Sequence, residues 1–104
     1  MVKIIIKYKG DKIEQFDVSG HANAGSYGHD LVCAAISGIV SGALNALDIN
    51  YHKKVSLKVL DNQILIIAKD LNDSYLQTML NMLKIQLHTI TMQYPKNTQF
   101  KEVN

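Results

Sequence analysis

Residues 20–38 read GHANAGSYGHDLVCAAISG and join a glycine-rich loop to an apolar helix. The stretch contains the only cysteine of the chain, two of its four histidines and four of its six glycines. Glycine gives the first half conformational freedom, whereas a helix holds its residues in fixed positions. We expect any chemistry of this protein at the point where the two halves join.

The helical half of this stretch is predicted to begin after Asp30, whose carboxylate can accept the N–H groups of the first turn. From Leu31 to Leu47 the sequence has no charged residue, although a surface helix normally has a charged face. The helix is therefore expected to be sandwiched on two sides or buried in a dimer interface. Gly38 and Gly42 each cost about 1 kcal/mol of helix propensity relative to Ala, so a closely packed neighbour is the expected compensation. Residues 48–54 are predicted to be a polar connection.

Alternating apolar and polar residues predict five β-strands in the rest of the chain. The predicted ranges are about residues 2–8, 13–18, 55–59, 64–68 and 98–103. Ile13 is out of phase with Phe16 and Val18, which indicates a bulge or an exposed isoleucine. The uniformly apolar run over 64–68 is typical of an interior strand.

Leucine and methionine residues at helical spacing predict a second helix, capped by residues 71–73 and ended before Pro95. The predicted order is strand, strand, helix, strand, strand, helix, strand. The sequence therefore predicts one α+β domain over residues 1–104, with a mostly antiparallel sheet and both helices on one face.

Composition and charge exclude several classes of protein. The formal net charge of +2 is too small to indicate direct binding of nucleic acid. No run of about 18 apolar residues predicts a membrane span, and the first residues lack a signal-peptide pattern. A single cysteine cannot form an internal disulfide, which is typical of the cytoplasm. We expect a cytoplasmic protein that binds neither a membrane nor nucleic acid.

Cys33 is the strongest candidate for a chemical role. With Asp30 as the N-cap, Cys33 is predicted in the first helical turn, where the helix dipole stabilises a thiolate. His21 could take the thiol proton or pair with the thiolate, and N–H groups of the loop and helix start could bind an oxyanion. This pattern is typical of a cysteine nucleophile and indicates acyl transfer or peptide hydrolysis.

The same residues also have purely structural interpretations. A lone cysteine in an apolar helix is most often a small buried hydrophobe, and Asp30 is first a cap and only second a group that could orient His21. Ser37, one turn after Cys33, either bonds back to the helix or forms a polar wall of the site. His21, His29 and Cys33 are three possible metal ligands, but no second cluster completes a structural zinc site. We expect no metal and no cofactor.

The sequence resembles the family of ribosomal-processing cysteine proteases called Prp. The residues that carry the resemblance are Gly20-His21-Ala22, Gly28, Asp30, Val32-Cys33-Ala34-Ala35 and Ser37, and the likeness extends over the whole chain to Tyr94-Pro95. The resemblance implies that Cys33 is the nucleophile and His21 the general acid/base. It also implies a homodimer that removes the N-terminal extension of a large-subunit ribosomal protein.

The loop before Cys33 is implied to order when substrate binds, which would leave the Cys33–His21 pair unassembled until then. We expect these loop residues to be Gly20, Ala22, Asn23, Gly25, Tyr27 and Gly28. Tyr27 could gate the site or pack against the first two strands.

Two other functions remain open at this point. The main alternative is a dimeric, non-enzymatic module that binds a ribosomal protein or assembly factor through an open sheet edge. RNA binding by the lysine-bearing sheet ranks last, because these strands lack interleaved aromatic residues. Cleavage preference, a third catalytic residue, the dimer geometry and the resting loop conformation do not follow from the sequence.

Overall fold

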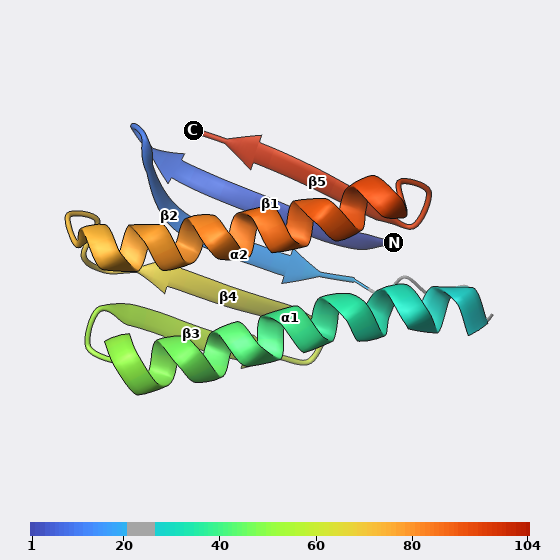
Figure 1. Cartoon of the computed structure of the whole chain (residues 1–104), viewed down its shortest axis with the longest axis horizontal. Coiled ribbons are helices and arrows are strands. Elements are labelled where there is room, and N and C mark those ends of the chain that lie inside the picture. The colour runs from blue at the N-terminus through green and yellow to red at the C-terminus, as the bar shows by residue number, and fades with distance from the viewer. Residues whose placement is uncertain (21–26) are drawn as a thin grey trace.

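A five-stranded sheet carries two helices on one of its faces (Figure 1). The computed structural model describes the backbone of residues 1–20 and 27–104 and the side chains of residues 1–20 and 31–104. The elements are β1 (Val2–Lys9), β2 (Lys12–Ser19), α1 (Tyr27–Tyr51), β3 (Val55–Leu60), β4 (Gln63–Ala68), α2 (Ser74–Gln93) and β5 (Thr98–Val103). The predicted α+β class and element order are confirmed.

The strands lie in the order β3-β4-β2-β1-β5. Three neighbouring pairs are antiparallel, and only β5 runs parallel to β1, with Val2 opposite Thr98. A parallel neighbour needs a long crossover, which α2 supplies by passing over the sheet. The prediction of a mostly antiparallel sheet is confirmed, and β4 is an interior strand as its apolar sequence indicated.

A β-bulge lies in the first hairpin. The β1–β2 register shifts after Lys7 and leaves Glu14 without a partner in β1, so Ile13 turns inward and is 3% exposed. The side chain of Gln77 in α2 accepts from the Ile13 N–H at 2.8 Å and donates to the Ile13 carbonyl at 2.9 Å. The predicted bulge is therefore present, and the alternative of an exposed Ile13 is wrong.

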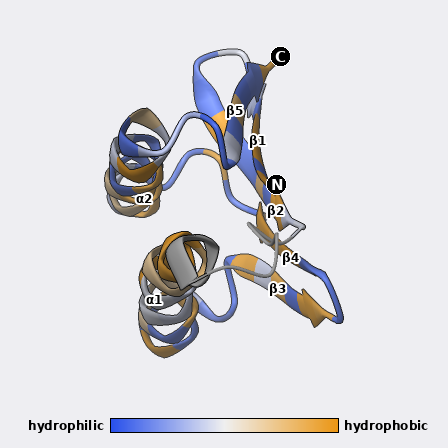
Figure 2. Ribbon diagram, turned by 90° about the vertical axis from the view of Figure 1, so that its right-hand side faces the viewer, coloured by the Kyte–Doolittle hydropathy of each residue, from blue (hydrophilic) through white to orange (hydrophobic). Residues whose placement is uncertain are grey.

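The core fills the layer between the sheet and the helices (Figure 2). Its centre is formed by the fully buried side chains of Ile4, Ile6, Phe16 and Ile66 from the sheet. The helices bury residues at three- and four-residue spacing, which places them on one face. These residues are Val32, Ile36, Val40 and Leu47 in α1, and Leu76, Leu80, Leu83 and Leu87 in α2.

Helix α1 is longer than predicted at both ends. It begins at Tyr27, so the predicted start after Asp30 is wrong. It continues to Tyr51, so the predicted polar connection over residues 48–54 is wrong except for the turn that follows Tyr51. Asp48 and Asn50 are exposed on the last turns. Their polar side chains thus face solvent from a helix, and Leu47 still packs in the core.

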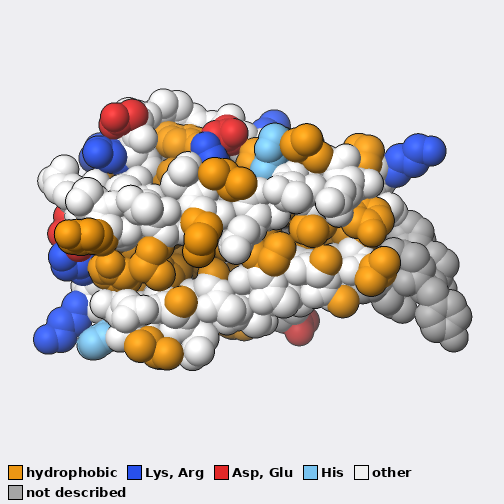
Figure 3. All heavy atoms as spheres, viewed as in Figure 1, with side chains coloured by type: hydrophobic (Ala, Val, Ile, Leu, Met, Phe, Trp, Pro, Cys, Tyr) orange, Lys and Arg blue, Asp and Glu red, His pale blue; other side chains and the backbone are white. Residues whose placement is uncertain are grey.

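One face of α1 is covered by no other described element. A Cβ atom added at Gly38 or Gly42 would meet nothing within 4 Å, so no described residue packs closely against these glycines. The prediction that α1 is sandwiched on two sides is therefore wrong for the described residues. Both glycines line an apolar groove of about 290 Å³ between α1 and α2. Figure 3 shows apolar side chains along this seam.

The residues Leu31–Tyr51 of α1 are long and apolar enough to cross a membrane, by length and composition only. One such helix is weak evidence of a membrane span, so the sequence prediction of no transmembrane helix stays a prediction. The core helix of a soluble protein passes the same test, and α1 lies on the sheet through Val32, Ile36 and Val40.

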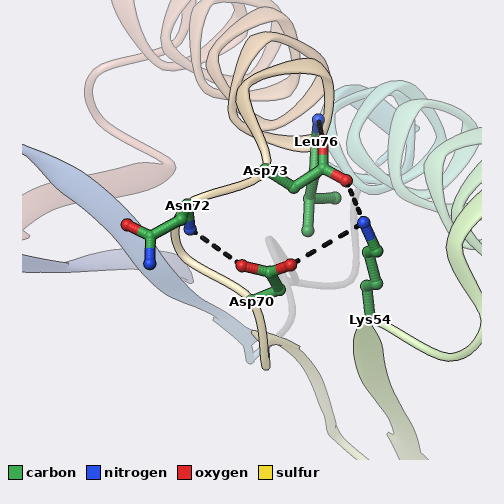
Figure 4. Close-up of polar contacts among 5 residues, drawn as sticks. All are labelled: Lys54, Asp70, Asn72, Asp73 and Leu76. Atoms are coloured by element: carbon green, nitrogen blue, oxygen red, sulfur yellow. Dashed lines mark hydrogen bonds and ion pairs between the residues drawn. The ribbon is translucent and has the colours of Figure 1, made fainter.

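A polar cluster joins the turn that follows α1 to the turn that precedes α2 (Figure 4). Asp73 caps α2 by accepting from the Leu76 N–H at 3.0 Å, which confirms the cap predicted over 71–73. Lys54, after α1, donates to Asp73 at 2.5 Å and lies 3.7 Å from Asp70. The Asp73 hydrogen bond raises the pKa of Lys54, and Lys54 lowers the pKa of Asp73.

Candidate active site

Cys33 lines a pocket of about 300 Å³ at the end of the sheet where β1 begins and β2 ends. Helix α1 forms one wall, the strand ends form the floor and the β3–β4 turn forms the opposite rim. The lining residues are Val2, Val18, Ser19, Gly20, Cys33, Ile36, Ser37, Val40, Val59, Leu60, Asp61, Asn62, Gln63 and Ile64. Most are apolar, and Asp61 is the only charged residue among them.

The packing of α1 fixes the direction of Cys33. Val32 and Ile36 are buried against the sheet, so Cys33, between them in sequence, lies at the border of the core. It is half-buried, and Ser37, one turn later, is exposed on the same pocket. The structure thus brings Cys33 and Ser37 together, as expected of a nucleophile and a polar wall.

The backbone at Gly20 closes the pocket from the β2 side. Gly20 has φ +83°, a left-handed conformation that glycine adopts without strain. Its N–H donates to the Asn62 carbonyl at 3.2 Å. A Cβ on Gly20 would overlap the carbonyl oxygen of Met1, so no other residue fits without a shift. The chain therefore leaves β2 toward His21 from a fixed point.

Several predicted site residues fall outside this description. His21, Ala22, Asn23 and Gly25 lie outside the described residues. The prediction that they belong to a substrate loop therefore stays a prediction.

The start of α1 corrects three other predictions. Tyr27 and Gly28, predicted in the loop, belong to the first turn of α1, and Asp30 lies within the helix rather than at its N-cap. The side chains of Tyr27 and Asp30 are outside the description. The gating and orienting roles predicted for them remain predictions.

Cys33 is in the second helical turn, six residues after Tyr27, and not in the first turn as predicted. The helix dipole acts mainly on the first turn, and the unpaired N–H groups of a helix are its first four. The prediction that the helix dipole and the free N–H groups of the first turn act directly on Cys33 is therefore wrong.

The opposite rim of the pocket consists of residues that were not among the predicted site residues. Val59 and Leu60 end β3, Asp61 and Asn62 form the turn, and Gln63 begins β4. These residues are distant from Cys33 along the chain, so no local spacing could connect them with it. The signal available in the sequence was the apolar pair Val59-Leu60 directly before the turn residues Asp61-Asn62.

No group of three His, Cys, Asp or Glu side chains suited to a metal ion occurs within residues 1–20 and 31–104. The pocket itself combines an accessible thiol with apolar walls and a rim of backbone and amide groups. Such a pocket can hold a carbonyl compound against the thiol and exclude part of the surrounding water. A thiol held against a bound carbonyl group is one of the requirements of acyl transfer through a thioester.

Comparisons with known proteins agree on one family. The family model for the cysteine protease Prp matches residues 1–99. The ribosomal processing cysteine protease Prp of Staphylococcus aureus (strain Mu50) is 32% identical over 104 residues, which cover 92% of this chain and 92% of that protein.

Two crystal structures of an essential ribosomal processing protease Prp from S. aureus are also similar. The one with a covalently linked product peptide has a TM-score of 0.86 at 28% identity and covers 98% of this chain and 99% of that chain. The one with a substrate peptide has a TM-score of 0.87 at 27% identity, with the same coverage.

Proposed function

Because the chain belongs to the Prp family of cysteine proteases, we propose that it cleaves a peptide bond with Cys33 as nucleophile and His21 as general acid/base. The observation that carries the proposal is the half-buried Cys33 on the wall of an apolar pocket. The related S. aureus structures hold a substrate peptide and a covalently linked product peptide, which supports covalent chemistry at a thiol.

In the proposed reaction, His21 takes the proton of Cys33, and the thiolate attacks the carbonyl carbon of the scissile bond. The tetrahedral intermediate collapses to a thioester, and the leaving amine receives the proton from His21. Water then hydrolyses the thioester, again with His21 as base, and the thiol is restored. Ser37 borders the reacting atoms as a polar wall, and Asp30 orients His21.

The proposed substrate is the N-terminal extension of a large-subunit ribosomal protein. The relatives are named ribosomal processing proteases, and the described lining of the pocket is mostly apolar, as suits an apolar peptide segment. We propose that this peptide contacts Gly20, the following residues Ala22, Asn23 and Gly25, and Tyr27 and Gly28 at the start of α1.

We further propose that residues 1–104 form one domain and that the protein acts as a cytoplasmic homodimer without cofactor, metal, membrane or nucleic acid. The apolar groove between α1 and α2, with Gly38 and Gly42 uncovered, supports a second copy as its occupant.

Incubation with the extended ribosomal protein tests the proposal directly. Mass spectrometry should show a truncated product with the wild type and none with Cys33→Ala, whose circular dichroism should be unchanged. His21→Ala should also fail to cleave. Normal cleavage by Cys33→Ala would exclude the proposed nucleophile. A stable complex with no change in the partner's mass would instead support the non-enzymatic binding module.

A further inference from the structure

Strand β3 leaves one side of the sheet open beside the Cys33 pocket. It is the outermost strand and pairs only with β4 (Figure 2). In an edge strand, about half of the N–H and C=O groups point away from the partner strand and can pair with an added strand.

The end of β3 is apolar and exposed, which is unusual for an unprotected edge. Val59 is 68% and Leu60 is 52% exposed. The other edge strand, β5, carries Lys101 and Glu102, and Glu102 accepts a hydrogen bond from Tyr8. Charged side chains normally protect sheet edges from pairing. β3 carries one such residue, the exposed Lys58, and ends in the uncharged pair Val59 and Leu60, whereas β5 carries Lys101 and Glu102 next to each other.

The exposed end of β3 is continuous with the Cys33 pocket. Val59 and Leu60 line that pocket, and Val59 also lines a second groove of about 360 Å³ between α1 and β3. The second groove adds Ser41 and Leu44 of α1 and Leu57 of β3. A depression thus follows the α1–β3 seam away from Cys33.

We infer that the substrate peptide binds as a sixth strand along the outer edge of β3, with alternate side chains in the α1–β3 seam and its scissile carbonyl at Cys33. The inference rests on the proposed protease function and adds the mode of substrate binding. Strand addition satisfies the open backbone groups of β3, and the two grooves receive every second side chain. Only an extended, unbranched peptide has this combination of backbone and side-chain spacing.

The charge of the groove lining also favours one class of peptide. Among the described residues that line the two grooves, Asp48 and Asp61 are the charged ones, and both are acidic. A neutral or basic peptide complements this seam, whereas an acidic one is repelled.

Hydrogen exchange gives a test that does not depend on activity. Cys33→Ala binds the peptide without cleaving it, and binding should slow exchange of the outward-facing amides of β3 and leave those of β5 unchanged. The probe is a synthetic peptide of the ribosomal protein's extension. Peptide binding that leaves β3 exchange unchanged would overturn the inference.

Kinetics give the second test, with a matched control on the other edge. Val59→Lys or Leu60→Lys should raise KM about tenfold with little change in kcat, the effect of losing one apolar contact of about 1.4 kcal/mol. Val103→Lys, an exposed apolar position on β5, should change neither constant. Equal effects at Val59 and Val103 would contradict the inference.

A third measurement uses the substrate backbone. Methylation of single amide nitrogens along the peptide should raise KM at every second position and not at those between, because a strand pairs through alternate residues. A uniform effect would overturn strand addition while the protease function stands. Absence of cleavage of any extended peptide by the wild type would instead overturn the proposed function itself.

Discussion

The backbone N–H of Gly20 lies 3.2 Å from the carbonyl oxygen of Asn62 and donates a hydrogen bond to it. This bond ties the end of β2 to the β3–β4 turn across the pocket that contains Cys33. The two residues are far apart in sequence, and the contact fixes the point from which the chain continues to His21.

Gly20→Ala should reduce both stability and cleavage. Alanine in the left-handed region costs about 1–2 kcal/mol, and its Cβ would also overlap the Met1 carbonyl, so the loss should exceed that range. Gly10→Ala is the matched control, because Gly10 has φ +64° with nothing within 4 Å of the added Cβ. Urea denaturation measures both losses, and equal values would contradict the predicted overlap.

Ser37→Leu should block access to Cys33. Ser37 is exposed on the pocket wall, so a leucine there fills the space without entering the core. The alkylation rate of Cys33 by iodoacetamide should fall about tenfold, equivalent to about 1.4 kcal/mol in activation free energy. Asn81→Leu, at an exposed position on α2, should leave the rate unchanged.

Gly42→Leu should separate the proposed dimer without harming the monomer. Nothing lies within 4 Å of an added Cβ there, and leucine favours a helix over glycine by about 0.8 kcal/mol. Sedimentation velocity should show a monomer for Gly42→Leu and a dimer for the wild type. Asn50→Leu, at the exposed end of α1, should remain a dimer. A monomeric wild type would contradict the proposal.

The Asp73–Lys54 pair should make stability fall in acid. The hydrogen bond from Lys54 lowers the pKa of Asp73, so the folded state resists protonation more than the unfolded state. Stability from this pair is present above about pH 4, the ordinary value for an aspartate, and is lost as the pH falls below it. Asp73→Asn keeps a helix cap and should flatten this part of the urea-midpoint profile.

Tyr8 and Lys84 should make stability fall in base. Burial and a hydrogen bond to Glu102 raise the pKa of Tyr8, and the Tyr8 hydroxyl raises the pKa of Lys84. The folded state therefore holds both protons more tightly, and stability declines as the pH rises above about 10. Tyr8→Phe should weaken this decline in urea midpoints, and an unchanged decline would assign it to other groups.

Much of the fold could be predicted because its signals are local. The alternation in β1 and β5, the Asp73 cap and Pro95 after α2 each depend on residues close together in sequence. The bulge at Glu14 was also visible as a phase change before Phe16. The ends of α1 were not predictable in this way, because Asp48 and Asn50 can face solvent from a helix as readily as from a loop.

Only one wall of the candidate site could be predicted from the sequence. Cys33 and Ser37 are one helical turn apart, so their common face follows from helix geometry alone. Their pocket depends on Val59, Leu60 and Asn62, which sheet pairing brings across from another part of the chain.

The α+β order, the buried faces of the strands and of α2, and the single thiol all follow from the amino-acid sequence alone. Periodicity and capping act over a few residues, so they can be read directly along the chain. The position of Cys33 in the second turn of α1, opposite the β3–β4 turn and beside the open end of β3, follows only from the folded structure. These relations depend on long-range packing of α1 on the sheet, and no short stretch of sequence specifies that packing.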